Sequence, residues 1–108
     1  MSIKQAQQWL DQQTNVNQSL YAVMVQYEIG EATEYRLINA GSLGLYPTTL
    51  ISHAVWMGYS FTYFTAKQLI GKTIFTENDE YEINRAFIVK KENGYRIVKE
   101  VAPRPGTA

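Results

Sequence analysis

The sequence predicts a single α+β domain with a mostly antiparallel sheet of four to five strands and about two helices on one face. Three observations favour this class: 108 residues suffice for one core, segments of strand-like and helical pattern alternate, and glycine-containing turns separate the strands. The expected order is α-β-β-α-β-β-β. Residues 1–101 are expected to form the domain, and residues 102–108 a mobile C-terminal tail.

An amphipathic helix is expected to open the chain. Ser2 and Gln5 have the spacing of a capping box, and Ile3, Ala6 and Leu10 then recur at helical spacing. Because this apolar stripe is narrow, the helix is expected to pack against a sheet rather than to form a core alone.

A central strand is expected next. Residues 20–27 are rich in β-branched and aromatic side chains and are apolar at both alternating sets of positions, which is typical of a strand covered on both faces. A polar loop from Glu28 to Glu34 contains Gly30 and leads to a second strand near residues 35–40. A hairpin is the simplest connection between the two.

The second helix is expected over residues 49–57, with Gly58 just past its end. On that helix Ser52 and Trp56 fall opposite the aliphatic side, and His53 lies at the border between the two sides.

Alternating aromatic residues after Gly58 predict a strand. Tyr59, Phe61 and Tyr63 occupy every second position up to Thr65, so on a strand their rings share one face. We expect that face to pack against the helices, because helices need an apolar sheet surface to cover.

Three shorter features precede the last hairpin. Gly71 is expected to end a single helical turn, Ile74 and Phe75 to add a short strand, and Glu77 to Glu82 to form an acidic loop.

A basic hairpin that turns at residues 92–94 is expected to close the fold. A three-residue loop pairs Val89 with Ile97 and Ile88 with Val98, whereas a two-residue loop sets Ile88 against a lysine. Apolar cross-strand pairs contribute about 0.2–1 kcal/mol each, which favours the longer loop.

Composition argues against several classes of function. Ten basic and ten acidic residues leave no net charge, which disfavours nucleic acid and anionic membranes as partners. The absence of cysteine excludes thiolate sites and disulfides, and the cytoplasm is the favoured compartment. Without an apolar run long enough to span a membrane, no membrane partner is expected. His53 is the only histidine, so no catalytic set, metal site or cofactor is expected.

The stretch from residue 57 to residue 64 resembles the RNP1 motif of RNA-recognition domains at Gly58, Tyr59, Phe61 and Phe64. The resemblance implies exposed rings on which bases stack. Together with the basic hairpin it supports an alternative function, a module that binds single-stranded nucleic acid. The residues that would serve this function are Tyr59, Phe61, Tyr63, Lys90, Lys91 and Arg96.

The leading expectation is a small non-enzymatic domain of the adaptor, immunity or inhibitor type, which acts by occupying a partner protein. It rests on the lack of a catalytic set and of net charge, and on Trp56, because aromatic residues are enriched at the centres of protein interfaces. A homo-oligomer is compatible with this expectation. A second alternative is a small-ligand site in the loop from Gly41 to Tyr46. The residues expected to contact a partner are Trp56, Tyr46, His53 and Ser52.

Overall fold

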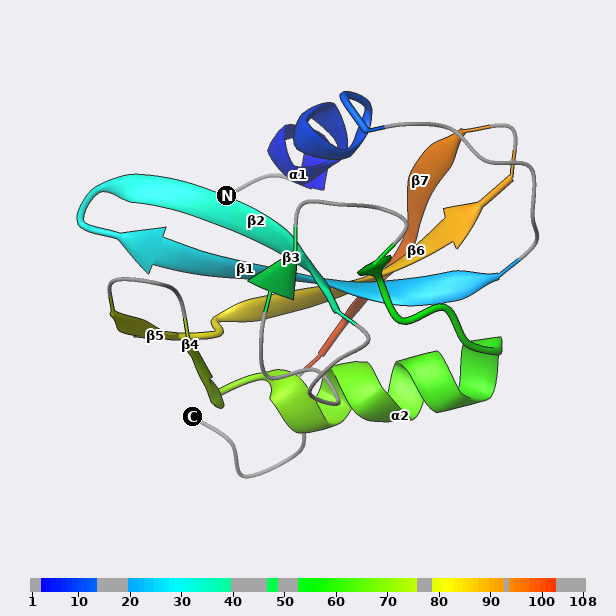
Figure 1. The fold of residues 1–108 in the computed structure, drawn as a ribbon. Helices are drawn as coiled ribbons and strands as arrows, with labels where there is room; N and C mark the ends of the chain where they lie inside the picture. Colours follow the sequence, from blue (N-terminus) through cyan, green and yellow to red (C-terminus); the bar gives the residue numbers. More distant parts are fainter. Residues whose placement is uncertain are drawn as a thin grey trace.

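One helix covers each face of a five-stranded antiparallel sheet (Figure 1). The structure, a computed structural model, describes residues 3–13, 20–39, 47–48, 53–75, 79–92 and 94–102. The strands of the main sheet run in the order β3-β2-β1-β6-β7, and β4 and β5 form a separate two-stranded ribbon. The elements are α1 (Ile3–Leu10), β1 (Tyr21–Ile29), β2 (Ala32–Ile38), β3 (Pro47–Thr48), α2 (Tyr59–Leu69), β4 (Thr73–Phe75), β5 (Glu80–Glu82), β6 (Arg85–Lys91) and β7 (Tyr95–Val101).

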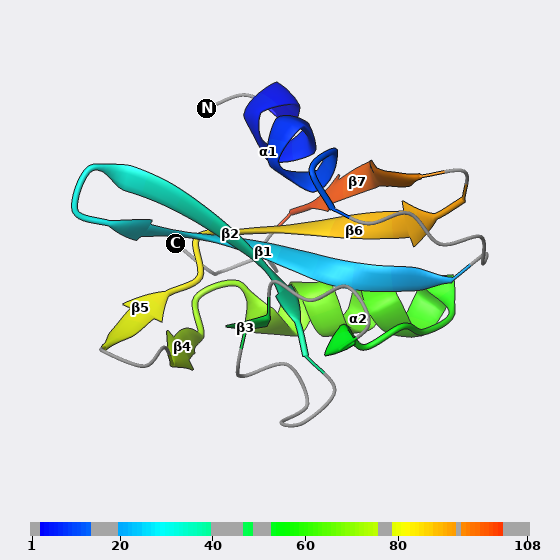
Figure 2. The same cartoon turned by 45° about the horizontal axis from the view of Figure 1, so that its top comes forward.

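The predicted fold class and the order of the elements are confirmed, with the short strands β3 and β5 added. The helices do not share one face as expected, because α1 and α2 lie on opposite sides of the sheet (Figures 1 and 2). The reason is that the inner strands carry apolar side chains on both faces, and each face needs a cover. Neither helix of the described residues has the length and apolar character needed to cross a bilayer.

β1 is the central strand that the sequence predicts. All six residues from Ala22 to Tyr27 are buried, and the strand pairs with β2 on one side and β6 on the other. Because side chains alternate along a strand, β1 contributes to two apolar clusters. The α1-side cluster contains Ala6, Leu10, Ala22, Met24, Tyr35, Leu37, Ala54, Phe87, Val89 and Tyr95. The α2-side cluster contains Val23, Val25, Tyr27, Ile38, Ala66, Leu69, Ile74, Ile83, Ala86, Ile88 and Val101.

The predicted helix over residues 49–57 is wrong at its described end. Residues 53–57 contain two isolated β-bridges, one from Ala54 to Asn39 and one from Met57 to Tyr21. The amide of Tyr21 donates to the Met57 carbonyl at 2.9 Å, and the amide of Met57 donates to the Tyr21 carbonyl at 2.7 Å. β2 pairs with β1 only from Met24 onward, so this segment occupies the edge of β1 that β2 leaves open. Residues 49–52 lie outside the described residues.

The predicted strand after Gly58 is also wrong, because these residues form α2. Gly58 is the N-cap of this helix, with φ −68° and ψ 163°, and not the residue that ends a preceding one. Two threonine hydroxyl groups of this helix bond back to the preceding turn: Thr62 Oγ1 donates to the Gly58 carbonyl at 2.7 Å, and Thr65 Oγ1 to the Phe61 carbonyl at 2.8 Å. These bonds satisfy the hydroxyl groups of both threonines within the helix.

The shorter features after α2 agree largely with expectation. Gly71 follows the C-cap residue Ile70 and has φ 89°, which confirms that a glycine ends the helical segment. The expected single turn is wrong, because the segment is the end of the 11-residue helix α2. The expected short strand is β4. Within the expected acidic loop, residues 80–82 form β5 and pair with β4.

The register of the last hairpin is confirmed near the turn and wrong beyond it. Val89 pairs with Ile97, and Gly94 has φ 118°, as expected for the three-residue loop. A bulge then shifts the pairing, so that Ile88 faces Lys99 rather than Val98. Residues 97 and 99 of a regular strand would lie on the same face, but the bulge moves Lys99 to the α2 side. Because of this shift, the two ends of β7 contribute to different clusters. Tyr95 at its start lies in the α1-side cluster, and Val101 at its end lies in the α2-side cluster.

Helix α1 is attached to β7 through one side chain, the amide of Gln7. Its Nε2 donates to the Tyr95 carbonyl at 3.1 Å, and its Oε1 accepts from the backbone amide of Ile97 at 2.8 Å. Gln7 therefore satisfies one acceptor and one donor of a strand at the edge of the sheet, in the way that a further strand would. Packing of Ala6 and Leu10 into the α1-side cluster completes the attachment.

We expect Gln7→Ala to lower the free energy of unfolding by about 1–3 kcal/mol, because it leaves two partly buried backbone groups of β7 without these partners. Urea denaturation of the wild type and the variant measures the difference. Gln8→Ala is the matched control, since Gln8 is exposed on the same helix and the two substitutions have the same effect on helix propensity. Equal stability of the two variants would contradict the proposed role of Gln7.

Candidate functional site

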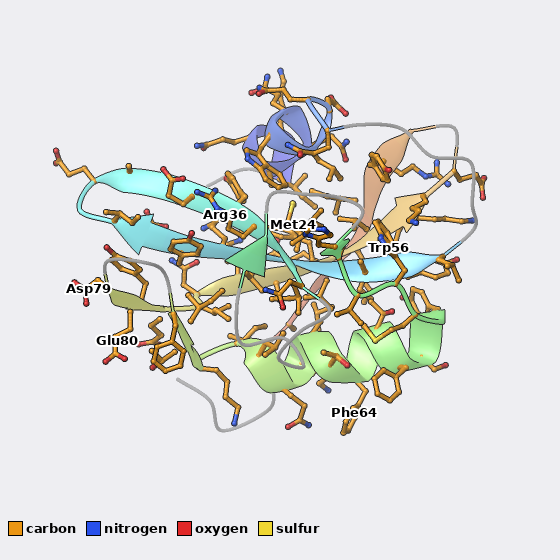
Figure 3. All side chains as sticks on the ribbon, in the orientation of Figure 1. Met24, Arg36, Trp56, Phe64, Asp79 and Glu80 are labelled. Atoms are coloured by element: carbon orange, nitrogen blue, oxygen red, sulfur yellow. The ribbon has the colours of Figure 1, made fainter. Side chains whose placement is uncertain are left out.

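The outer surface of α2 carries exposed aromatic rings. Phe61 and Phe64 are 63% and 60% exposed, and Tyr59 at the start of the helix is 41% exposed. Residues three apart on a helix are neighbours on its surface, so the two phenylalanines form one apolar site, here called the phenylalanine pair. Figure 3 shows Phe64 pointing away from the sheet. Two large rings in such a position are typical of an interaction surface.

The small residues on the inner side of α2 explain why the rings point outward. Thr62, Ala66 and Leu69 are the buried positions of the helix. Two of these three side chains are short, which lets the helix backbone approach the α2-side cluster closely. The larger phenylalanine rings then lie on the opposite side of the helix, in solvent.

A row of three tyrosine rings lies along one flank of α2. Tyr21 of β1 meets Tyr59 edge to face, with ring centroids 5.2 Å apart, and Tyr59 lies 6.3 Å from Tyr63. Tyr21 and Tyr63 also pack against the α2-side cluster. This row therefore joins the helix to the sheet and belongs partly to the core.

Lysine side chains lie over these rings. The Nζ of Lys90 lies 5.6 Å from the centre of the Tyr21 ring, and those of Lys67 and Lys99 lie 5.7 and 6.0 Å from the centre of the Tyr63 ring. These distances are within the range of cation–π attraction. The lysine–tyrosine strip, as we call it, consists of Tyr21, Tyr59, Tyr63, Lys67, Lys90 and Lys99.

Arg96 extends the positive charge of this strip. It pairs with Lys90 across the hairpin, which places both side chains on the α2 side of the sheet. Lys90 forms an ion pair with Glu92 at 2.6 Å; this bond raises the pKa of Lys90 and lowers that of Glu92. Among the described residues, no carboxylate lies within ion-pair distance of Lys67, Arg96 or Lys99. Glu92 also interacts electrostatically with Arg96, so the charge that these residues leave unneutralised is mainly that of Lys67 and Lys99.

Trp56, expected at a partner surface, is half-buried on the α1 side. Its ring stacks on Tyr95 with centroids 5.9 Å apart, and Lys91 Nζ lies 4.2 Å from the centre of the Trp56 ring. Lys91 is itself buried, which lowers its pKa by desolvation. His53 is exposed at the start of this segment. The other two residues expected at a partner surface, Tyr46 and Ser52, lie outside the described residues, as does the Gly41–Tyr46 loop.

The residues expected to bind nucleic acid are divided between surfaces. Tyr59 and Tyr63 lie in the strip, but Phe61 points outward, because a helix does not place alternate residues on one face. The expectation that all three rings face the core is wrong for Tyr59 and Phe61, which are exposed. Lys90 and Arg96 share the α2 side, whereas Lys91 lies over Trp56 on the α1 side.

A shallow depression lies at the far end of β7, with a volume of about 310 Å³. Its charged groups are Arg85 and Glu100, which are bound to each other: Arg85 Nε donates to Glu100 Oε2 at 2.7 Å. Since each group satisfies the other, the depression offers little charge to a small ligand. In the described part of the chain, no group of three or more His, Asp or Glu side chains has the arrangement of a metal site.

Four residues of these surfaces were not among the residues expected to contact a partner or nucleic acid, although the second of them matches the RNP1 pattern: Tyr21, Phe64, Lys67 and Lys99. The spacing of Phe61 and Phe64 is a helical signal that the strand interpretation concealed. The position of Lys99 depends on the bulge, for which the sequence has no clear signal.

Comparison of the chain with known protein families, with curated proteins and with solved structures gave no match.

The Arg85–Glu100 pair predicts a specific dependence of stability on acid. The hydrogen bond from Arg85 holds the pKa of Glu100 below its ordinary 4.5, so the stabilisation is present above that pH and is lost as the pH falls. Because Glu100 is partly exposed, solvent screening limits the effect to about 1 kcal/mol or less. Between about pH 7 and pH 3, we expect the unfolding free energy of Glu100→Gln to fall less than that of the wild type.

Urea denaturation at each pH measures this difference, with Glu31→Gln, in the exposed β1–β2 turn, as the control. An acid dependence of Glu100→Gln as steep as that of the wild type would rule out the pair as its source.

Proposed function

We propose that the protein is a small protein-binding domain of the adaptor, immunity or inhibitor type, which occupies its partner through the outer surface of α2. The single observation that carries the proposal is the phenylalanine pair, exposed side by side on one helix. Burying two such rings against a partner removes a large apolar area from water, at about 25 cal/mol per Å². The proposed setting is the cytoplasm, in keeping with a chain that has no cysteine.

The mode of binding follows from the position of these rings. An amphipathic helix that binds in a groove uses anchors at positions i, i+3 and i+4 or i+7, and Phe61 and Phe64 have the first of these spacings. Gln68, one turn after Phe64, extends the same side of the helix with a polar group. The partner is therefore expected to hold the helix in a shallow apolar groove.

This proposal places the anchors on α2 rather than at Trp56. The indole of Trp56 already stacks on Tyr95, so a large part of its surface is used within the fold. Burying the exposed phenylalanine rings against a partner contributes more binding free energy than burying Trp56, because more of their apolar area is still in contact with water.

A module for single-stranded nucleic acid is the second candidate, favoured by the presence of Tyr59 and Tyr63 beside Lys90 and Arg96. Base stacking needs free ring faces, and in the strip a lysine lies over Tyr21 and two lie over Tyr63. This arrangement favours the protein-binding function over the nucleic-acid one.

We expect the double variant Phe61→Ser/Phe64→Ser to fold with nearly unchanged stability, because both rings are exposed, and to lose partner binding. Anchor aromatics at interface centres contribute about 2 kcal/mol or more each, so the affinity should fall by at least about a hundredfold. The measurement is isothermal titration with the partner, captured on immobilised wild-type protein and then purified.

Phe75→Ser is the matched control, since Phe75 is an exposed phenylalanine on β4, away from α2. Binding of the double variant that equals that of the wild type would contradict the proposal. Retention of nucleic acid alone, abolished by nuclease, would support the second candidate instead.

A further inference from the structure

Resting on the proposed function, the geometry points to the chemistry of the partner: a protein whose apolar groove is bordered on one side by carboxylates. The border would face the lysine–tyrosine strip and Arg96, while the groove holds the phenylalanine pair. Three features of the molecule support this chemistry: the two surfaces are continuous, cations are available, and the fold places most acidic groups elsewhere.

The continuity of the surfaces comes from Lys67. It follows Tyr63 by four residues and Phe64 by three on α2, so it lies between the strip and the phenylalanine pair. Its Nζ lies over the ring of Tyr63, on the side of the strip. A partner that covers Phe64 therefore meets a lysine at the rim of the contact, where charged groups of interfaces are usually found.

Two of the cations are available because the described part of the chain provides no carboxylate within ion-pair distance of Lys67 or Lys99. Arg96 also forms no ion pair there, but the charge of Glu92 lies near enough to interact with it. Lys99 is on this side only because of the bulge between Ile88 and Val89, which turns its side chain toward Tyr63. Two ammonium groups then lie within about 6 Å of one ring centre, at 5.7 and 6.0 Å.

Acidic groups gather at the opposite end of the molecule. The β1–β2 turn and the β4–β5 ribbon lie at one end of the sheet, and the end of β6 and the start of β7 lie at the other (Figures 1 and 2). Asp79 and Glu80 mark the acidic end in Figure 3. The separation is partial, because Arg36 pairs with Glu34 at the acidic end and Glu92 pairs with Lys90 at the other. Such an uneven distribution of charge still orients the molecule toward an acidic partner, which raises the rate of productive encounters. The acidic residues of this end are Glu28, Glu31, Glu34, Asp79, Glu80 and Glu82.

Three kinds of probe test this chemistry by titration into the ¹⁵N-labelled protein, followed by NMR. Two are peptides of equal length and charge, one alternating glutamate with leucine and one alternating glutamate with serine; the third is an oligothymidylate with the same number of charges. We expect the glutamate–leucine peptide to bind most tightly. It should shift the amide signals of both α2 and the strip, because it alone combines acidic and apolar groups.

Charge reversal tests the contribution of the cations. Arg96→Glu/Lys99→Glu should weaken binding of the glutamate–leucine peptide on the order of tenfold at about 50 mM salt, and much less at about 500 mM, where exposed charges are screened. Lys4→Glu/Lys72→Glu reverses two exposed lysines outside this surface and is the matched control. The neutral variant Arg96→Gln/Lys99→Gln should fall between wild type and reversal, and serves as the test if the reversed variant does not fold.

Each outcome separates this inference from the proposed function. If Phe61→Ser/Phe64→Ser abolishes peptide binding and the charge reversal leaves it unchanged, the acidic border is wrong while the phenylalanine pair remains the anchor. Tightest binding of the oligothymidylate, or equal binding of the leucine and serine peptides, overturns the inference of an acidic and apolar protein surface. A dimer in light scattering that dissociates in the phenylalanine variant identifies a second copy as the occupant and overturns it as well.

Discussion

The structure depends on the burial of β1 on both of its faces. Its alternating side chains form two apolar sheet surfaces, and exposing either to water is unfavourable. One helix therefore packs over each surface. Gln26, the one amide side chain of the buried run, is partly satisfied there: its Nε2 donates to Asn84 Oδ1 at 3.2 Å, while its Oε1 has no hydrogen-bond partner among the described residues. The helices are therefore placed by the sheet rather than by each other, and the outer side of α2 stays exposed to solvent.

Much of this frame was predictable from the sequence, because it depends on local pattern. A run that is apolar at both alternating sets predicted β1, and the glycines at positions 71 and 94 predicted a helix end and a turn. The strand after Gly58 was wrong because Tyr59 and Tyr63 fit both periods: they alternate as on a strand and are also four residues apart, as on one side of a helix. Phe61 made the two periods harder to distinguish. Apolar periodicity is expected to mark buried residues, but the Phe61 ring is exposed and not part of the core.

The candidate surfaces were harder to predict, because they arise from relations between distant parts of the chain. Exposure of the phenylalanine pair depends on which side of α2 meets the sheet. The strip joins Tyr21 of the first strand to Lys99 of the last, and the bulge in β7 decides the face on which that lysine lies. Sequence periodicity describes one element at a time and does not contain such relations.

The contact between Gln7 and β7 bears on whether the edge of the sheet can pair with strands of other molecules. A strand edge with free amide and carbonyl groups can recruit strands from other chains and begin a growing β-fibril. Here the first helix occupies part of that edge through a single glutamine amide. Proteolytic loss of the first ten residues would expose this part of β7, so the integrity of a short N-terminal helix is also a safeguard against fibril formation.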